Sequence, residues 1–279
     1  MSKENNKYDW WTPEIWEQFY NEREEICFCN KEPDEVTDVA KMVNLKRLCM
    51  TNSSIDDLTL LEDLTKLEYA DLKNNLIEDL TPLAKLKNLN KIRLSDNEVE
   101  DLTPLAELTN LEWLHICSNN VYNLAPLAKL TKLKGISLSA NQIDDLTPLA
   151  ELTNLEWLCI CNNEVDDLTP LTGLTNLKTL CICHQELEDI SPLANLVNLQ
   201  HLHLENNRIE DISALSRMKK LKKLDMVDNY INDISPLYGM KKLKHLDLSG
   251  NDIDEEQAAI FSRHNPDCEV YLVSIEIDD

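Results

Sequence analysis

A strict 22-residue period is the feature that most constrains what this chain can fold into. From Arg23 onward the period runs without insertion, and one unit, residues 89–110, is LNKIRLSDNEVEDLTPLAELTN. Apolar residues occupy unit positions 1, 4, 6, 11, 14, 17 and 20, and Asn usually occupies position 9. One unit cannot bury its own leucines, so successive units must stack and share a continuous core. The units begin at Arg23, Leu45, Leu67, Leu89, Leu111, Leu133, Leu155, Leu177, Leu199, Leu221 and Leu243.

Each unit predicts a short strand followed by a tight turn. Around positions 3 to 7 the side chains alternate, as in a strand with one buried face. In the unit that begins at Leu111, Leu114 and Ile116 are expected to point inward. The Asn at position 9 is expected to end the strand by bonding backbone groups that the turn leaves unpaired. The following D-L-T-P-L places Thr as a cap and Pro in the first position of a 3-10 turn.

Stacking such units predicts an α/β solenoid. The strands form a parallel sheet on the inside of an arc, with neighbouring strands ~4.8 Å apart. The 3-10 turns form the outside, which packs more widely and therefore makes the array curve. The expected fold is a horseshoe with a concave parallel β-sheet and short 3-10 turns on its convex side.

Three segments are predicted along the chain. Residues 1–22 form an N-terminal helical cap, with Thr12 and Pro13 at the start of its helix. Residues 23–253 carry the repeats, the first of which is degenerate. Residues 254–279 form a capping helix, a closing strand and an acidic tail.

At the C-terminal end, Asp254 and Gln257 resemble the capping box of a helix over about residues 255–263. The closing strand is expected to keep the phase of the repeat, so that Cys268 and Val270 face inward.

The repeats resemble those of a known family. The segment LTPLAELTNLEWLHICSNN, residues 102–120, carries the pattern L-x-x-L-x-L-x-x-N and resembles the bacterial, internalin-type leucine-rich repeats. The phosphatase-regulator type is similar. The resemblance covers residues 45–253 and implies a horseshoe whose concave face binds protein. The sequence has neither the signal peptide nor the wall-anchoring tail of surface internalins, so we expect a cytoplasmic protein.

Charge narrows the class of partner. The formal net charge of −24 repels phosphate backbones and anionic membranes, so neither nucleic acid nor a membrane is an expected partner. It favours a protein with a basic or mixed-charge surface. No apolar run approaches the length of a membrane span, and the 9 cysteines do not form a secreted disulfide framework. We expect a monomer with no cofactor.

We expect the functional residues at the outward strand positions, because packing in the core dictates which residues occupy the other positions. Trp113 and Trp157 stand at position 3 of two units, about 10 Å apart across the unit between them. That unit shows only Gly135, Ser137 and Ser139, which predicts a slot with aromatic walls and a floor of small residues. Exposed tryptophans are typical of binding hot spots. The predicted partner-binding residues are Tyr69, Lys91, Arg93, Trp113, His115, Gly135, Ser137, Trp157, Cys159, Thr179, Cys181, His201 and His203.

Eight cysteines also lie on this face, at positions 5 and 7: Cys27, Cys29, Cys49, Cys117, Cys159, Cys161, Cys181 and Cys183. Three interpretations compete for the last four, which form a rectangle on two neighbouring strands. They could hold a metal ion with help from His184 or His203, form cross-strand disulfides, or give a soft apolar contact surface. The contact surface fits the sequence best.

The sequence therefore predicts a protein-binding module rather than an enzyme. A thiol nucleophile such as Cys117 or Cys181 needs a base, an orienting group and an oxyanion site, and an open regular sheet offers no pocket for them. One form of the predicted function is an inhibitor or immunity-type protein that covers a basic toxin or enzyme. The alternative is a metal-binding or thiol-sensing protein that uses the Cys and His side chains of the concave face.

Overall fold

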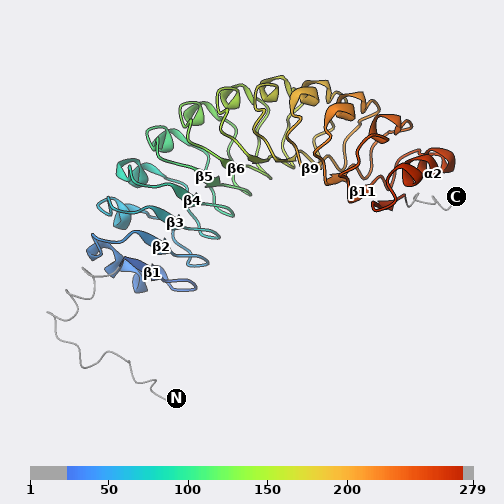
Figure 1. The fold of residues 1–279 in the computed structure, drawn as a ribbon. Coiled ribbons are helices and arrows are strands. Elements are labelled where there is room, and N and C mark those ends of the chain that lie inside the picture. Colours follow the sequence, from blue (N-terminus) through green and yellow to red (C-terminus); the bar gives the residue numbers. More distant parts are fainter. Residues whose placement is uncertain (1–23, 273–279) are drawn as a thin grey trace, which may run out of the picture.

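The computed structural model describes residues 24–272, which form one arc of stacked units with strands on the inner side and 3-10 turns on the outer side (Figure 1). The predicted N-terminal helical cap, 1–22, and the acidic tail lie outside the described residues. Within them, twelve parallel strands follow one another in sequence order. The strands are β1 (Glu25–Cys27), β2 (Arg47–Cys49), β3 (Tyr69–Asp71), β4 (Lys91–Arg93), β5 (Trp113–His115), β6 (Gly135–Ser137), β7 (Trp157–Cys159), β8 (Thr179–Cys181), β9 (His201–His203), β10 (Lys223–Asp225), β11 (His245–Asp247) and β12 (Glu269–Tyr271).

The strands cover positions 3 to 5 of each unit and are shorter than the alternating pattern predicts. The chain turns sharply at position 8, where the backbone takes the left-handed conformation whatever the residue. For example, φ is 56° at Asn74, 54° at Ala140 and 53° at Asp228. From β1 to β11, each strand pairs in register with the one 22 residues later, so Trp113 lies beside Gly135 and Gly135 beside Trp157. Side chains at one unit position therefore form straight rows across the sheet.

The core follows the phase predicted from the sequence. The apolar side chains at positions 1, 4, 6, 11, 14, 17 and 20 fill the interior between the sheet and the turns. Leu114 and Ile116 are both fully buried, as predicted. Burial of this kind contributes roughly 25 cal/mol for each Å² of apolar surface removed from water, and it is the main force that holds the units together.

A ladder of Asn side chains runs through the interior at position 9. Asn119 accepts a hydrogen bond from the Val99 N–H of the preceding unit at 2.9 Å. Its amide donates to the carbonyls of Leu94, Ile116 and Cys117 at 3.0, 3.3 and 3.0 Å. Each rung thus ties its own unit to the one before it, and satisfies backbone groups that no strand or helix pairs. The Asn rungs are Asn75, Asn97, Asn119, Asn141, Asn163, Asn207, Asn229 and Asn251.

Three described units carry another residue at this position: Lys31, Ser53 and Gln185. Gln185 continues the ladder, because its Nε2 donates to the Ile160 carbonyl and its Oε1 accepts from the Val165 N–H at 3.0 Å. The sequence pattern alone did not identify this rung. In the units of Ser53 and Gln185 the next residue also takes a positive φ, of 49° and 60°, so the turn changes in these two units.

The convex side consists of short 3-10 turns, and here the predicted cap is wrong. Thr103 is the first residue of its turn and Pro104 follows within it. The N-cap residue is Leu102, and the side chain that bonds the start of the turn is Asp101, whose carboxylate accepts from the Thr103 N–H at 2.8 Å. A carboxylate two residues before an N–H closes such a turn more readily than the Thr hydroxyl. The turns are η1 (Pro33–Glu35), η2 (Thr37–Lys41), η3 (Thr59–Leu61), η4 (Thr81–Lys85), η5 (Thr103–Leu105), η6 (Ala125–Leu127), η7 (Thr147–Leu149), η8 (Thr169–Leu171), η9 (Ser191–Asn195), η10 (Ser213–Arg217) and η11 (Ser235–Leu237).

The C-terminal end closes with helix α2 (Glu255–His264), where Asp254 accepts a hydrogen bond from the Gln257 N–H at 2.7 Å. β12 pairs with β11 through His245 and Glu269, which are 24 residues apart (269 − 245) instead of 22. The phase therefore shifts by two residues, contrary to the sequence prediction, because α2 is longer than the turn it replaces. The shift is even, so Val270 still packs against the core.

In residues 24–272, no helix is both long enough and apolar enough to cross a membrane.

Candidate binding surface on the concave sheet

The side chains at unit positions 3 and 5, the first and last residues of each strand from β1 to β11, project from the concave side, because the residue between them points into the core. At position 3, cations alternate with aromatic rings from β2 to β5. The Arg47 guanidinium carbon lies 4.6 Å from the centre of the Tyr69 ring. The Lys91 ammonium lies 6.0 Å from that ring and 5.9 Å from the Trp113 ring. These are cation–π distances, so Tyr69, Lys91 and Trp113 form one continuous surface.

The predicted slot between the two tryptophans is wrong in one respect: its floor is covered. A Cβ atom placed on Gly135 would lie 2.2 Å from Cζ3 of Trp113, so the indole rests directly on the backbone of Gly135. Gly135 is consequently buried, and Ser137 on the same strand is only 6% exposed. The indole takes this position because one of its faces then leaves water, while only a glycine at this place lets the ring approach so closely.

An open pocket remains beside the covered glycine. The His115 ring lies 5.4 Å from a Trp157 ring, tilted by 39°. Trp113 and Trp157 are both only half-buried, so a face or edge of each indole is accessible. An ion pair between Lys178 and Glu156, with 2.7 Å between Nζ and Oε2, lies at the border of the pocket. The pocket has a volume of about 430 Å³ and is lined by Lys91, Trp113, His115, Glu156, Trp157, Lys178 and Thr179.

Towards the N-terminus, position 5 carries a buried carboxylate. Asp71 is 7% exposed and lies 3.1 Å from Nη1 of Arg93. The Tyr69 hydroxyl donates to the same carboxylate at 3.1 Å. Two strands further along the position-5 row, His115 has its Nε2 buried without a hydrogen-bond partner. Burial, reinforced by the charge of Arg93, lowers the pKa of His115, so this imidazole is neutral at pH 7.

Towards the C-terminus, the same row becomes a charged network that the sequence did not identify. Asp225 is 6% exposed, and its Oδ2 lies 2.9 Å from Nδ1 of His203 and 2.8 Å from Nζ of Lys223. Glu205 lies 3.4 Å from the same imidazole nitrogen, and its hydrogen bond raises the pKa of His203. His201, at position 3, lies within 3.4 Å of the Thr179 hydroxyl. The predicted site residues therefore lie on one concave surface, which is aromatic around Trp113 and a charged network around His203.

The four cysteines of the predicted rectangle lie side by side on β7 and β8, or just after them, and their thiols contact one another in pairs: Cys159 is hydrogen-bonded to Cys161 and to Cys181, and Cys161 to Cys183. Cys159 contacts the Ser139 hydroxyl at 3.2 Å, Cys161 accepts from the Cys183 N–H at 3.2 Å, and the Cys183 thiol donates to Glu205 at 2.5 Å. Among the residues that the structure describes, no three sulfurs of this quartet all lie within 4.8 Å of one another. The thiols therefore interact in pairs and with neighbouring polar groups, rather than around one common point.

Comparison with known proteins is consistent with this geometry. The family model described as leucine-rich repeats (two copies) matches most of the chain, over residues 65–107, 109–151, 153–195, 175–217, 197–238 and 219–256. No curated protein matches the chain.

Several solved structures are similar. The internalin InlF from Listeria monocytogenes is 28% identical with a TM-score of 0.81, over 93% of this chain and 83% of that one. Internalin C2 from the same species is 38% identical with a TM-score of 0.64, over 65% of this chain and 80% of its own. The functional domain of InlJ from that species, described as including a cysteine ladder, is 22% identical with a TM-score of 0.72. That match covers 84% of this chain and 55% of InlJ, and it shows the fold alone.

Proposed function

The chain belongs to the leucine-rich-repeat family, and from that premise we propose that it holds a protein partner on its concave face, around Trp113, His115 and Trp157. An internalin-like leucine-rich-repeat domain is in general a protein-interaction module. Its concave sheet presents a rigid surface whose side chains differ from unit to unit, which suits the recognition of one particular partner.

The observation that carries the proposal is the pair of half-buried indoles beside an open pocket. Tryptophan, tyrosine and arginine dominate the binding energy of protein interfaces, especially near the centre of the contact. Trp113 is already held on Gly135, so little conformational entropy is lost when a partner covers it. The predicted site residues lie around this centre, on β3 to β9.

Charge supports a partner with a basic or mixed surface. The net charge of −24 includes two rows of carboxylates at unit positions 12 and 13, both exposed. Such a surface attracts a basic protein over a distance of about one Debye length, ~8 Å at physiological salt. An inhibitor or immunity-type protein that covers a basic toxin or enzyme is the specific form of binding that these charges favour.

Binding without catalysis fits the regular sheet. The strand N–H groups already donate to neighbouring strands, as in the bond from Trp113 N to the Asn90 carbonyl at 3.0 Å. No pair of free amides is therefore available on these strands to stabilise an oxyanion. The alternative of a metal site at Cys159, Cys161, Cys181 and Cys183 is less well supported, because no three of these sulfurs all lie within 4.8 Å of one another.

Replacing both indoles tests the proposal. Tagged wild-type protein, the double variant Trp113→Ala/Trp157→Ala and the control Tyr122→Ala are used to capture proteins from the source organism. Tyr122 is 53% exposed but lies at unit position 12, away from the concave rows. A partner retained by wild type and control should bind the double variant at least about 2 kcal/mol more weakly, or roughly 30-fold, by calorimetry with the purified pair. Equal affinity for all three proteins would place the contact elsewhere.

A further inference from the structure

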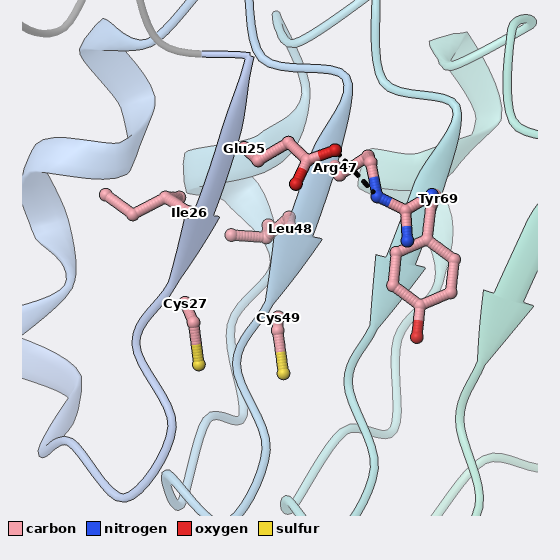
Figure 2. A pocket seen from close by; sticks show the side chains of 7 residues that line it. All are labelled: Glu25, Ile26, Cys27, Arg47, Leu48, Cys49 and Tyr69. Carbon is pink, nitrogen blue, oxygen red and sulfur yellow. Dashed lines mark ion pairs between the residues drawn. The ribbon is translucent and has the colours of Figure 1, made fainter.

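Three thiols gather at the first edge of the concave sheet. Cys27 and Cys49 are register partners in β1 and β2, so their side chains leave the sheet on the same side, as Figure 2 shows. Cys29 follows β1 at unit position 7. The sulfur of Cys29 lies 2.7 Å from that of Cys27 and 2.8 Å from that of Cys49. All three sulfur atoms lie within 4.8 Å of one another, and none is in a disulfide.

The chain contains a matched set with a looser geometry. Cys159, Cys161 and Cys181 occupy the same unit positions as Cys27, Cys29 and Cys49, and Cys159 is hydrogen-bonded to both of the others. The three sulfurs are nevertheless not all within 4.8 Å of one another. In the middle of the sheet, Ser139 of the preceding unit also contacts the Cys159 sulfur. Among the described cysteines, only the trio at this edge has three sulfurs that all lie within 4.8 Å of one another.

We propose that Cys27, Cys29 and Cys49 together bind one thiophilic metal ion. Zinc takes thiolate sulfur at ~2.3 Å, which places tetrahedral ligands roughly 3.7 Å apart. The Cys29 sulfur lies roughly 1 Å closer than this to each of the other two, so small side-chain rotations reach the spacing, and none of the three residues is fully buried. Copper(I) also prefers soft thiolate ligands, and three of them complete a trigonal site. Zinc would retain one open position.

Thiolates, rather than thiols, are the ligands of such an ion, so the metal displaces the protons of the three cysteines as it binds.

A pocket beside the cluster gives the ion access. It has a volume of about 350 Å³ and its walls include the thiol-bearing residues Cys27 and Cys49. Figure 2 shows Glu25 and Arg47 paired at its far side, with 3.1 Å between Oε1 and Nε. The pair leaves the space next to the sulfurs open to solvent, so water can take the fourth position on zinc.

The test uses full-length protein purified under reducing conditions and stripped of metal with a chelator. Zinc, and copper(I) in the absence of oxygen, are added as separate probes against a competing chelator of known affinity. Cobalt(II) serves as a spectroscopic probe, because thiolate ligands give it intense sulfur-to-metal charge-transfer bands. We expect one equivalent of zinc or copper(I) to bind, and the ion that binds more tightly identifies the site's preference.

Cys29→Ser should weaken binding by more than about 100-fold, since losing a group that only orients a ligand already costs about 10–100-fold. Cys161→Ser, at the same unit position in the matched set, should leave affinity and cobalt bands unchanged. Circular dichroism checks folding, and Cys27→Ser, which changes an exposed thiol, replaces Cys29→Ser if that variant does not fold. Three outcomes overturn the proposal: no stoichiometric binding, equal losses in Cys29→Ser and Cys161→Ser, or a disulfide within the trio that persists in reductant.

Discussion

The Asn ladder and the concave rows are built in the same way but behave in opposite ways. Each consists of side chains from one unit position, aligned by the same parallel register. The ladder repeats the same residue in eight units and is largely buried, whereas position 3 changes from Arg47 to Trp113 to Lys223 along the sheet. The difference shows that constant positions hold neighbouring units together, while changing positions carry what is particular to this protein.

The sharpest test of this contrast is Asn119→Ala, for which we expect a loss of about 3 kcal/mol in the free energy of unfolding. The change leaves the Val99 N–H buried without a partner and removes three further hydrogen bonds. Denaturation in urea measures the loss. The control is Asn120→Ala, an exposed side chain one residue later, which should change stability by less than about 0.5 kcal/mol. Equal effects for both variants would contradict a structural role for the ladder.

A smaller effect is expected within the concave rows, where the Trp113 indole lies against the backbone of Gly135. Gly135→Ala places a Cβ where the Trp113 ring now lies, so the indole must move away. We expect a loss of about 2 kcal/mol in the wild-type background. In the Trp113→Ala background the same change should have almost no effect, because the obstruction is gone. A double-mutant cycle by urea denaturation measures the coupling, and additivity of the two changes would disprove the close approach.

At Gln185, the rung that departs from the Asn pattern, we expect a substitution to raise the free energy of unfolding instead of lowering it. Gln185 donates to one described carbonyl, whereas Asn119 donates to three. Gln185→Asn should restore the missing bonds and raise the free energy of unfolding by about 1 kcal/mol. Gln142→Asn, the same change at an exposed position, is the control and should be neutral. A loss of stability in Gln185→Asn would mean that the altered turn of this unit requires the longer side chain.

The smallest effect concerns the two ends of the concave surface. His203 has a pKa raised above 6.5, first by its hydrogen bond to Glu205, while burial lowers the pKa of His115. The contribution of His203 to stability is therefore complete below pH 6.5 and is lost as pH rises through its raised pKa. That of His115 is present above pH 6.5 and is lost on acidification.

NMR titration of the imidazole signals measures both values in one experiment. We expect His203 to titrate above His115, and Glu205→Gln to lower only the pKa of His203. A common pKa for the two imidazoles would show that the charged and the aromatic ends of the surface do not differ electrostatically.

Periodicity was sufficient to predict the fold, because the interior positions obey one rule in every unit. Leu114 and Ile116 are buried for the same reason as their counterparts elsewhere, and the concave rows follow from the register. The cap was predicted wrongly because Thr103 and Asp101 both suit a turn, and only geometry shows which one receives the N–H. Gln185 was missed since an amide one methylene longer departs from the Asn pattern.

The site was harder to predict, because its geometry depends on rotamers rather than on the period. The positions of Trp113 and Trp157 were identified, but nothing in the spacing shows that one indole covers Gly135. The same limit applies to the thiols. Two sets of cysteines share identical unit positions, and only the set at the edge of the sheet has three sulfur atoms that all lie within 4.8 Å of one another.

The identical junctions made by the ladder bear on how such a molecule changes over generations. Since each rung bonds only its own unit and the preceding one, duplicating or deleting 22 residues as a block leaves every remaining junction with the partners it had before. A gene that gains a unit in this way lengthens the concave surface and acquires a new set of outward side chains, without redesigning the interior. Mutation can then alter those side chains freely, while the Asn at position 9 stays under constraint.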